Sequence, residues 1–121
     1  MAKTFLVVDD SASMRQLIAF AVQGAGFEAL VADSAQGALG KLADATIDMV
    51  ITDLNMPDMD GIELIKRLRG MPDHRFTPII MLTTESQEEK MQAGKAAGAS
   101  GWIIKPFSPE QLINVVRKFI R

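Results

Sequence analysis

The chain has 121 residues, 48% of them hydrophobic, so it is long enough for one hydrophobic core and too short for two ordinary domains. It contains no cysteine, which excludes disulfides, thiolate catalysis and metal sites built from cysteine. The formal net charge of −2 points to neither nucleic acid nor a membrane surface as a partner.

Charge is distributed unevenly along the chain. Residues 1–85 hold 7 Lys/Arg against 12 Asp/Glu, net −5, whereas residues 86–121 hold 6 against 3, net +3. Solvated helix faces and a partner-docking surface explain such a division equally well. No apolar stretch approaches the roughly 18 residues of a membrane span. The first residues, MAKTFLVVDD, lead into an acidic pair instead of a signal-peptide cleavage site, so we expect a cytoplasmic protein.

Short apolar runs alternate five times with longer segments of helical period, the pattern of a parallel sheet covered by helices on both faces. The predicted strands are, in chain order, 3–8, 28–31, 49–52, 79–83 and 101–104. The second is the least apolar and is therefore expected at an edge. Because no linker or repeat interrupts the series, we expect a single α/β domain over residues 1–121.

The first two predicted helices follow the first two strands. The first helix has an apolar stripe that is expected to face inward, formed by Met14, Leu17, Ile18 and Ala21. Gly24 and Gly26 are expected to end it. The second, over 35–42, is weaker because it contains two glycines.

Capping-box spacing sets the starts of the other three helices, in the pairs Asp60 with Glu63, Ser86 with Glu89, and Ser108 with Gln111. The longest irregular stretch is 70–78, where the single histidine, His74, is expected to be solvated. Lys90 and Lys95 on the fourth helix are interpreted as solvated charges, and as partner contacts only by hypothesis.

Polar residues stand at the carboxyl ends of four of the predicted strands. Asp9 and Asp10, Asp53, and Lys105 follow their strands directly, and Thr83 is the last residue of its strand. Because ligands of open α/β sheets bind at the carboxyl ends of the strands, these side chains are expected to line one crevice. An aspartate alone at such a place is usually a turn residue, but turn chemistry does not explain four strands that end in complementary groups. Three carboxylates, a hydroxyl and an ammonium suit a divalent cation together with a phosphoryl group.

Each of these groups has an expected chemical task. The carboxylate of Asp53, on a central strand, can act as a nucleophile and form an aspartyl phosphate. Asp9 and Asp10, with the backbone carbonyl of Asn55, supply oxygen ligands for Mg²⁺ and leave positions open for water and phosphate. The hydroxyl of Thr83 and the ammonium of Lys105 can each contact a phosphoryl oxygen.

Four motifs resemble the receiver domains of bacterial response regulators: FLVVDD at 5–10, ITDLNMPDMDG at 51–61, MLTTE at 81–85 and GWIIKPF at 101–107. The resemblance covers the whole chain and implies a flavodoxin-like (βα)5 doubly wound parallel sheet with strand order 2-1-3-4-5. It implies that Asp53 is the phosphoacceptor and a Mg²⁺ ligand, with Thr83 as switch hydroxyl and Lys105 as phosphate-binding lysine. It also implies a cis bond between Lys105 and Pro106.

Among receivers, the chain is most similar to the stand-alone, chemotaxis-type (CheY-like) members. This similarity implies a CheA-like histidine kinase as phosphodonor and a flagellar motor switch or another output as target, reached through the fourth helix, fifth strand and fifth helix. A phosphatase is a further expected partner, nucleic acid and membrane are not, and a monomer is expected. Such a protein is a signalling switch and no enzyme beyond its own phosphotransfer and dephosphorylation. A phosphate sink for the kinase remains an alternative.

Two positions depart from the pattern of chemotaxis members. Trp102 stands where a tyrosine is common on the fifth strand, so the expected switch aromatic is bulkier, lacks a hydroxyl, and is expected half-exposed or fixed in one rotamer; plain edge-strand packing is the alternative. Thr84 replaces a small residue at the rim of the site. Glu85 and Asn55 occupy rim positions that in receivers tune dephosphorylation, although Glu85 is equally well explained as a solvated residue.

Two other classes of protein fit the site less well. A haloacid dehalogenase-type phosphatase needs a second aspartate two residues after the nucleophile, where this chain has Asn55, which cannot exchange a proton as a carboxyl does. A flavodoxin-like flavin carrier needs a phosphate loop rich in Ser, Thr and Gly after the first strand. Asp9 and Asp10 at that place would repel the flavin phosphate.

Overall fold

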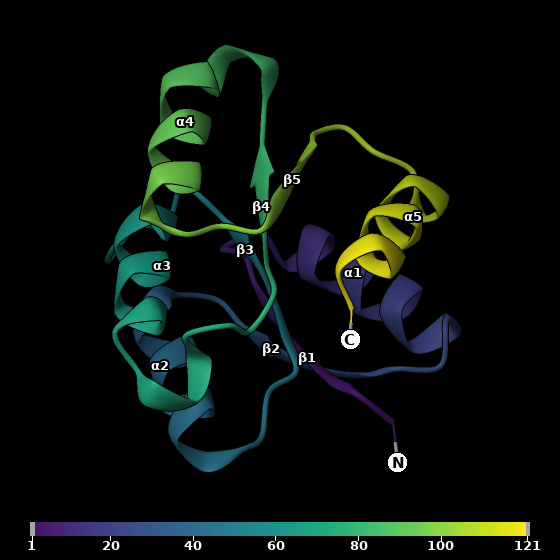
Figure 1. The fold of residues 1–121 in the computed structure, drawn as a ribbon. Helices are drawn as coiled ribbons and strands as arrows, with labels where there is room; N and C mark the ends of the chain where they lie inside the picture. The colour runs from purple at the N-terminus through teal and green to yellow at the C-terminus, as the bar shows by residue number, and fades with distance from the viewer. Residues whose placement is uncertain (1, 121) are drawn as a thin grey trace.

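In the computed structural model of the chain, residues 2–120 are described, and the side chain of Glu85 lies outside the described part. The strands are β1 (Thr4–Val8), β2 (Glu28–Ala32), β3 (Met49–Asp53), β4 (Ile79–Thr83) and β5 (Gly101–Ile104). They form one parallel sheet in the order β2-β1-β3-β4-β5, which confirms the predicted flavodoxin-like topology and the edge position of β2 (Figure 1). The strand ends differ from the predicted ones by one residue at most.

The helices are α1 (Ala12–Gly24), α2 (Ala35–Asp44), α3 (Gly61–Arg69), α4 (Glu88–Ala97) and α5 (Pro109–Phe119), with short 3-10 helices η1 (Pro72–His74) and η2 (Glu85–Gln87). Figure 1 shows α1 and α5 on one face of the sheet and α2, α3 and α4 on the other. Within the described residues, no helix combines the length and apolar character that crossing a membrane requires.

The hydrophobic core has two layers, one on each face of the sheet. Alternate residues of β1 serve the two layers, because successive side chains of a strand point to opposite faces. Phe5 and Val7 pack toward α1 and α5, whereas Leu6 and Val8 pack toward α2 and α3. The central strands β3 and β4 are buried along their whole length. This explains their continuous apolar sequences and gives the site at their ends a rigid support.

Side-chain caps begin α3 and α5 at the residues that the sequence indicates. The Asp60 carboxylate accepts from the backbone N–H of Glu63 at 2.9 Å at the start of α3. Ser108 and Gln111 form the predicted capping box of α5, and Pro109 is its first residue. The Lys105–Pro106 bond is cis, as the family resemblance implies.

Three predictions about local structure are wrong. The fourth helix does not start from Ser86 and Glu89: Thr84 and Gln87 cap η2 first, and α4 begins at Glu88. Leu17 of α1 is 37% exposed, because the buried face of the helix is centred on Ile18 and Val22 and Leu17 lies at its margin.

His74 is the third of these corrections, since its side chain is only 8% exposed. Its Nδ1 lies 3.0 Å from the hydroxyl oxygen of Thr77. The guanidinium of Arg69 donates to the carbonyls of His74 and Thr77, at 2.9 and 2.7 Å, and to that of Gly98. These bonds fold the stretch after α3 back onto the domain and cover the histidine.

Candidate functional site

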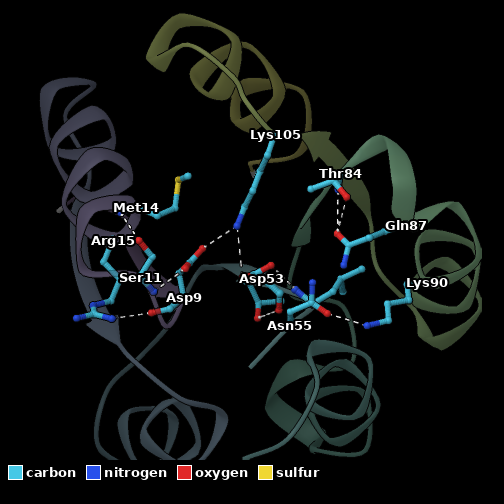
Figure 2. A network of polar contacts seen from close by, with 12 residues as sticks. Asp9, Ser11, Met14, Arg15, Asp53, Asn55, Thr84, Gln87, Lys90 and Lys105 are labelled. Atoms are coloured by element: carbon cyan, nitrogen blue, oxygen red, sulfur yellow. Dashed lines mark hydrogen bonds and ion pairs between the residues drawn. The ribbon is translucent and has the colours of Figure 1, made fainter. Parts of the chain in front are cut away.

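The carboxyl ends of β1, β3 and β5 bring two acidic side chains and one basic side chain together. Asp9 follows β1, Asp53 is the last residue of β3, and Lys105 follows β5. The Lys105 ammonium nitrogen lies 3.3 Å from Asp9 Oδ2 and 3.4 Å from Asp53 Oδ2 (Figure 2). The two carboxylates are almost fully buried, whereas the lysine side chain is 22% exposed. The predicted convergence of these strand ends is therefore present in the structure.

Backbone groups hold the second oxygen of each carboxylate. Asp9 Oδ1 accepts from the N–H of Ser11 at 2.9 Å, and Asp53 Oδ1 accepts from the N–H of Leu54 at 2.8 Å. Arg15 on α1 donates to the Asp9 carbonyl at 2.7 Å. Because each carboxylate is fixed on one side by the backbone and on the other by Lys105, the site is preorganised.

The pKa of Asp53 is raised above its ordinary value of 3.8. Burial of the charge is the largest cause; the ammonium of Lys105 opposes it, and the negative charge of Asp9 adds to it. A further positive charge nearby stabilises the ionised form of such a carboxylate. The electrostatics of the site thus favour a bound cation beside Asp53.

Asp9, Asp10 and Asp53 form a cluster whose ligand oxygens all lie within 4.8 Å of one another. Asp10 is exposed and the other two are buried, so the cluster is open to solvent on one side. A set of carboxylate oxygens suits a hard cation that keeps some of its water, as Mg²⁺ does. The donor set therefore fits the metal that the sequence predicts.

The loop after β3 carries Asn55 and is tied to neighbouring helices. The carboxylate of Asp58 accepts from the N–H groups of Ala35 and Gln36, at 3.2 and 3.0 Å, at the start of α2. The bond from Gln36 is the main cause that lowers the pKa of Asp58. The Asn55 amide oxygen accepts from the Lys90 ammonium on α4 at 2.7 Å. Lys90, expected to be a solvated charge, thus has a specific partner.

The sequence analysis missed the roles of Asp58 and Lys90. It also missed that position 61 requires a glycine. A Cβ at Gly61 would collide with the Asp53 carbonyl oxygen and with Leu54 Cα. The N–H of Gly61 donates to the Leu54 carbonyl at 2.9 Å, which closes the loop. The Asp-Gly pair before α3 was the available signal for this tight approach.

The predicted hydroxyl and rim residues lie at the end of β4. Thr83 is 1% exposed, and its hydroxyl donates to the carbonyl of Thr84 at 3.3 Å. The Thr84 hydroxyl lies 3.2 Å from Gln87 Oε1 and 2.9 Å from Ser86 Oγ, so it takes part in capping η2. Glu85 lies outside the described side chains, and its place at the rim stays a prediction.

Trp102 on β5 is 38% exposed, in line with the expectation of a half-exposed ring. The Lys95 ammonium on α4 lies 4.8 Å from the centroid of its ring. This distance is typical of a cation–π contact, so Lys95 is more than a solvated charge.

Comparison with known proteins gives consistent results. A family model described as the response regulator receiver domain matches residues 5–117. The structure of chemotaxis response regulator CheY4 of Vibrio cholerae is 44% identical with a TM-score of 0.94, over 99% of this chain and 100% of that chain. A CheY-like receiver domain protein from Methanospirillum hungatei is 25% identical with a TM-score of 0.90, over 98% and 93%.

A longer relative is also similar to the whole chain. The phosphate regulon transcriptional regulatory protein PhoB of Pseudomonas aeruginosa is 38% identical over 121 residues, which are 100% of this chain and 53% of that protein. The chain thus spans about half the length of the curated relatives that it matches.

Proposed function

The chain belongs to the response regulator receiver domain family, and from this premise we propose that it is a phosphorylation-controlled switch with Asp53 as its phosphoacceptor. One observation carries the proposal: a buried carboxylate at the end of a central strand lies 3.4 Å from a lysine ammonium and within a cluster of three carboxylates. A nucleophile, a charge for the incoming phosphoryl group and oxygen ligands for a cation are thus present together. Phosphoryl transfer requires mainly such positioning and charge stabilisation.

In the proposed step, an Asp53 carboxylate oxygen attacks the phosphorus of a phosphohistidine on the kinase. A P–O bond forms, the P–N bond breaks, and its electron pair remains on the imidazole nitrogen. Lys105 is close enough to exchange its contact with the Asp53 oxygen for one with a phosphoryl oxygen. Asp9 keeps the lysine in place through the second ion pair.

Mg²⁺ is the proposed cofactor, held by Asp9, Asp10, Asp53 and the backbone carbonyl of Asn55. When bound, it would offset the repulsion between the carboxylates and the dianionic phosphoryl group. The acidic cluster and the burial-raised pKa of Asp53 support this assignment.

The proposed output surface is α4, β5 and α5. Phosphorylation would draw the Thr83 hydroxyl from the Thr84 carbonyl to a phosphoryl oxygen, and Trp102 would respond on β5. The similarity to CheY4 along the whole of that chain supports a chemotaxis-type role, with a CheA-like kinase as donor and a flagellar motor switch as target. We propose no catalytic activity beyond the protein's own phosphotransfer and dephosphorylation.

Intact mass after incubation with acetyl phosphate and Mg²⁺ tests the phosphoacceptor. The wild-type protein should gain the mass of one phosphoryl group, and Asp53→Asn should gain none. Asp44→Asn, an exposed aspartate at the end of α2, is the control for loss of a carboxylate and should behave as the wild type. Phosphate uptake at a single site by Asp53→Asn would show that the nucleophile is another residue.

A further inference from the structure

Asn55 and Lys90 form a contact that joins the phosphoacceptor loop to α4. The Lys90 ammonium lies 2.7 Å from the Asn55 amide oxygen, between residues that are 35 positions apart in the sequence. In Figure 2, Asn55 lies between Asp53 and Lys90. Asn55 is exposed and only two residues beyond Asp53, so its side chain borders the space that a phosphoryl group on Asp53 would occupy.

The chemistry of the two groups fixes the orientation of the amide. An ammonium has three donors and no acceptor, so Lys90 can pair only with the oxygen of the Asn55 side chain. The amide nitrogen then remains as a donor, and among the described side chains it has no hydrogen-bond partner. Lys90 therefore holds Asn55 in an orientation that leaves one N–H donor available at the rim of the site.

The backbone beneath Asn55 is also held in place. The loop is closed by the bond from Gly61 N–H to the Leu54 carbonyl, and it is tied to the start of α2 by Asp58. Because this backbone is already ordered, forming the contact restricts only two side chains, that of Asn55 and that of Lys90. A single exposed hydrogen bond can then fix the rotamer of the amide.

We propose that Lys90 is a positioning residue for the loss of the phosphoryl group from Asp53, an inference that rests on the proposed function. Hydrolysis requires a water to approach the phosphorus opposite the Asp53 oxygen. The water oxygen forms the new P–O bond, the P–O bond to Asp53 breaks, the carboxylate is restored, and the proton of the water leaves with inorganic phosphate. The Asn55 N–H, oriented by Lys90, holds the oxygen of this water, as carboxamide groups do in other phosphoryl-transfer sites.

The decay of phosphorylated protein tests this inference. Wild type and variants are loaded with acetyl phosphate at saturating Mg²⁺, the donor is removed, and the phosphorylated fraction is followed by intact mass. Lys90→Met keeps the unbranched apolar part of the side chain without the charge and should slow decay about 3- to 10-fold, the effect of losing one exposed charge-assisted hydrogen bond. Lys90→Arg, which retains a cationic donor, should restore a rate near that of the wild type.

Two further variants separate positioning from charge. Asn55→Ala should slow decay to a similar extent, and adding Lys90→Met to it should produce no further slowing. Lys66→Met removes an exposed lysine of α3 as the control for charge and should decay as the wild type does. The midpoint of urea unfolding should be equal in Lys90→Met and Lys66→Met.

The possible failures are distinguishable. The positioning role alone is overturned if Lys90→Met decays at the wild-type rate. It is also overturned if Lys90→Met slows decay equally in the wild-type protein and in Asn55→Ala. Absence of any phosphoryl mass on the wild-type protein overturns the proposed function, and the positioning role with it.

Discussion

Replacing Asp53 by asparagine should stabilise the fold when Mg²⁺ is absent. Asp53 is 6% exposed, and the oxygens of the three clustered carboxylates lie within 4.8 Å of one another. At an effective dielectric constant of about 20, the repulsion from the Asp9 carboxylate amounts to roughly 3.5 kcal/mol, and the attraction to Lys105 at 3.4 Å to roughly 5 kcal/mol. Burial of the charge is the largest cause that raises the pKa of Asp53, and it outweighs this net attraction, so removing the charge leaves a gain of about 2 kcal/mol.

The asparagine loses the ion pair with Lys105 but keeps the other neighbouring contacts. Its amide oxygen can still accept from the N–H of Leu54, and Lys105 retains its ion pair with Asp9. For a chain of this length, 2 kcal/mol corresponds to an increase in Tm of about 8 °C. Urea unfolding and thermal melts with a chelator present measure the change, and Asp44→Asn controls for the loss of one negative charge.

The gain should depend on pH in a defined direction. The pKa of Asp53 is higher in the folded protein than in the unfolded chain. The stability that this carboxyl group contributes is therefore fully present below its pKa in the unfolded chain, and it is lost as the pH rises through its pKa in the folded protein. Asparagine does not titrate, so the advantage of the variant should be larger at about pH 7.5 than at about pH 4.5. A variant less stable than the wild type at neutral pH, or an advantage that does not shrink on acidification, would refute this reasoning.

Three other substitutions have definite expected outcomes. Asp10→Asn should lower Mg²⁺ affinity about tenfold or more in calorimetric titration while leaving the unfolding midpoint near that of the wild type, because Asp10 is an exposed member of the cluster; unchanged affinity would contradict its role as a ligand. Lys105→Ala should slow phosphate uptake from acetyl phosphate by roughly 100-fold and abolish the fluorescence response of Trp102 to beryllofluoride, and normal uptake would refute its charge role. Gly61→Ala should destabilise the fold by about 1–3 kcal/mol in urea, because its Cβ meets backbone atoms of Asp53 and Leu54.

The strand order and the convergence at the site could be predicted because they depend on local patterns. Each strand is a short apolar run, and the polar residue that follows marks its carboxyl end. Parallel strands place these ends at one edge, so the meeting of Asp9, Asp53 and Lys105 followed from topology.

The start of the fourth helix could not be determined in the same way. Thr84 with Gln87 has the same three-residue spacing as Ser86 with Glu89, so the capping pattern fits both pairs. The end of β4 at Thr83 selects the first pair, since the chain turns immediately after the strand.

The contacts around the site were beyond sequence reasoning for a different reason. Asn55 with Lys90, and Trp102 with Lys95, depend on where α4 lies relative to β3 and β5. Asp58 accepts from the first backbone N–H groups of α2, more than twenty residues earlier in the sequence. No periodicity or spacing encodes such pairings, because they result from the packing of whole elements.

Helix α4 packs against the domain with few buried residues, and this affects its local unfolding. Gly94 is the one buried residue of this helix, whereas α3 buries Gly61, Leu64, Ile65 and Leu68. A Cβ at Gly94 would collide with the sulfur of Met81, so the helix approaches the sheet through a bare backbone. Local unfolding of α4 therefore exposes little apolar surface, and its amide hydrogens should exchange with deuterium well before those of α3.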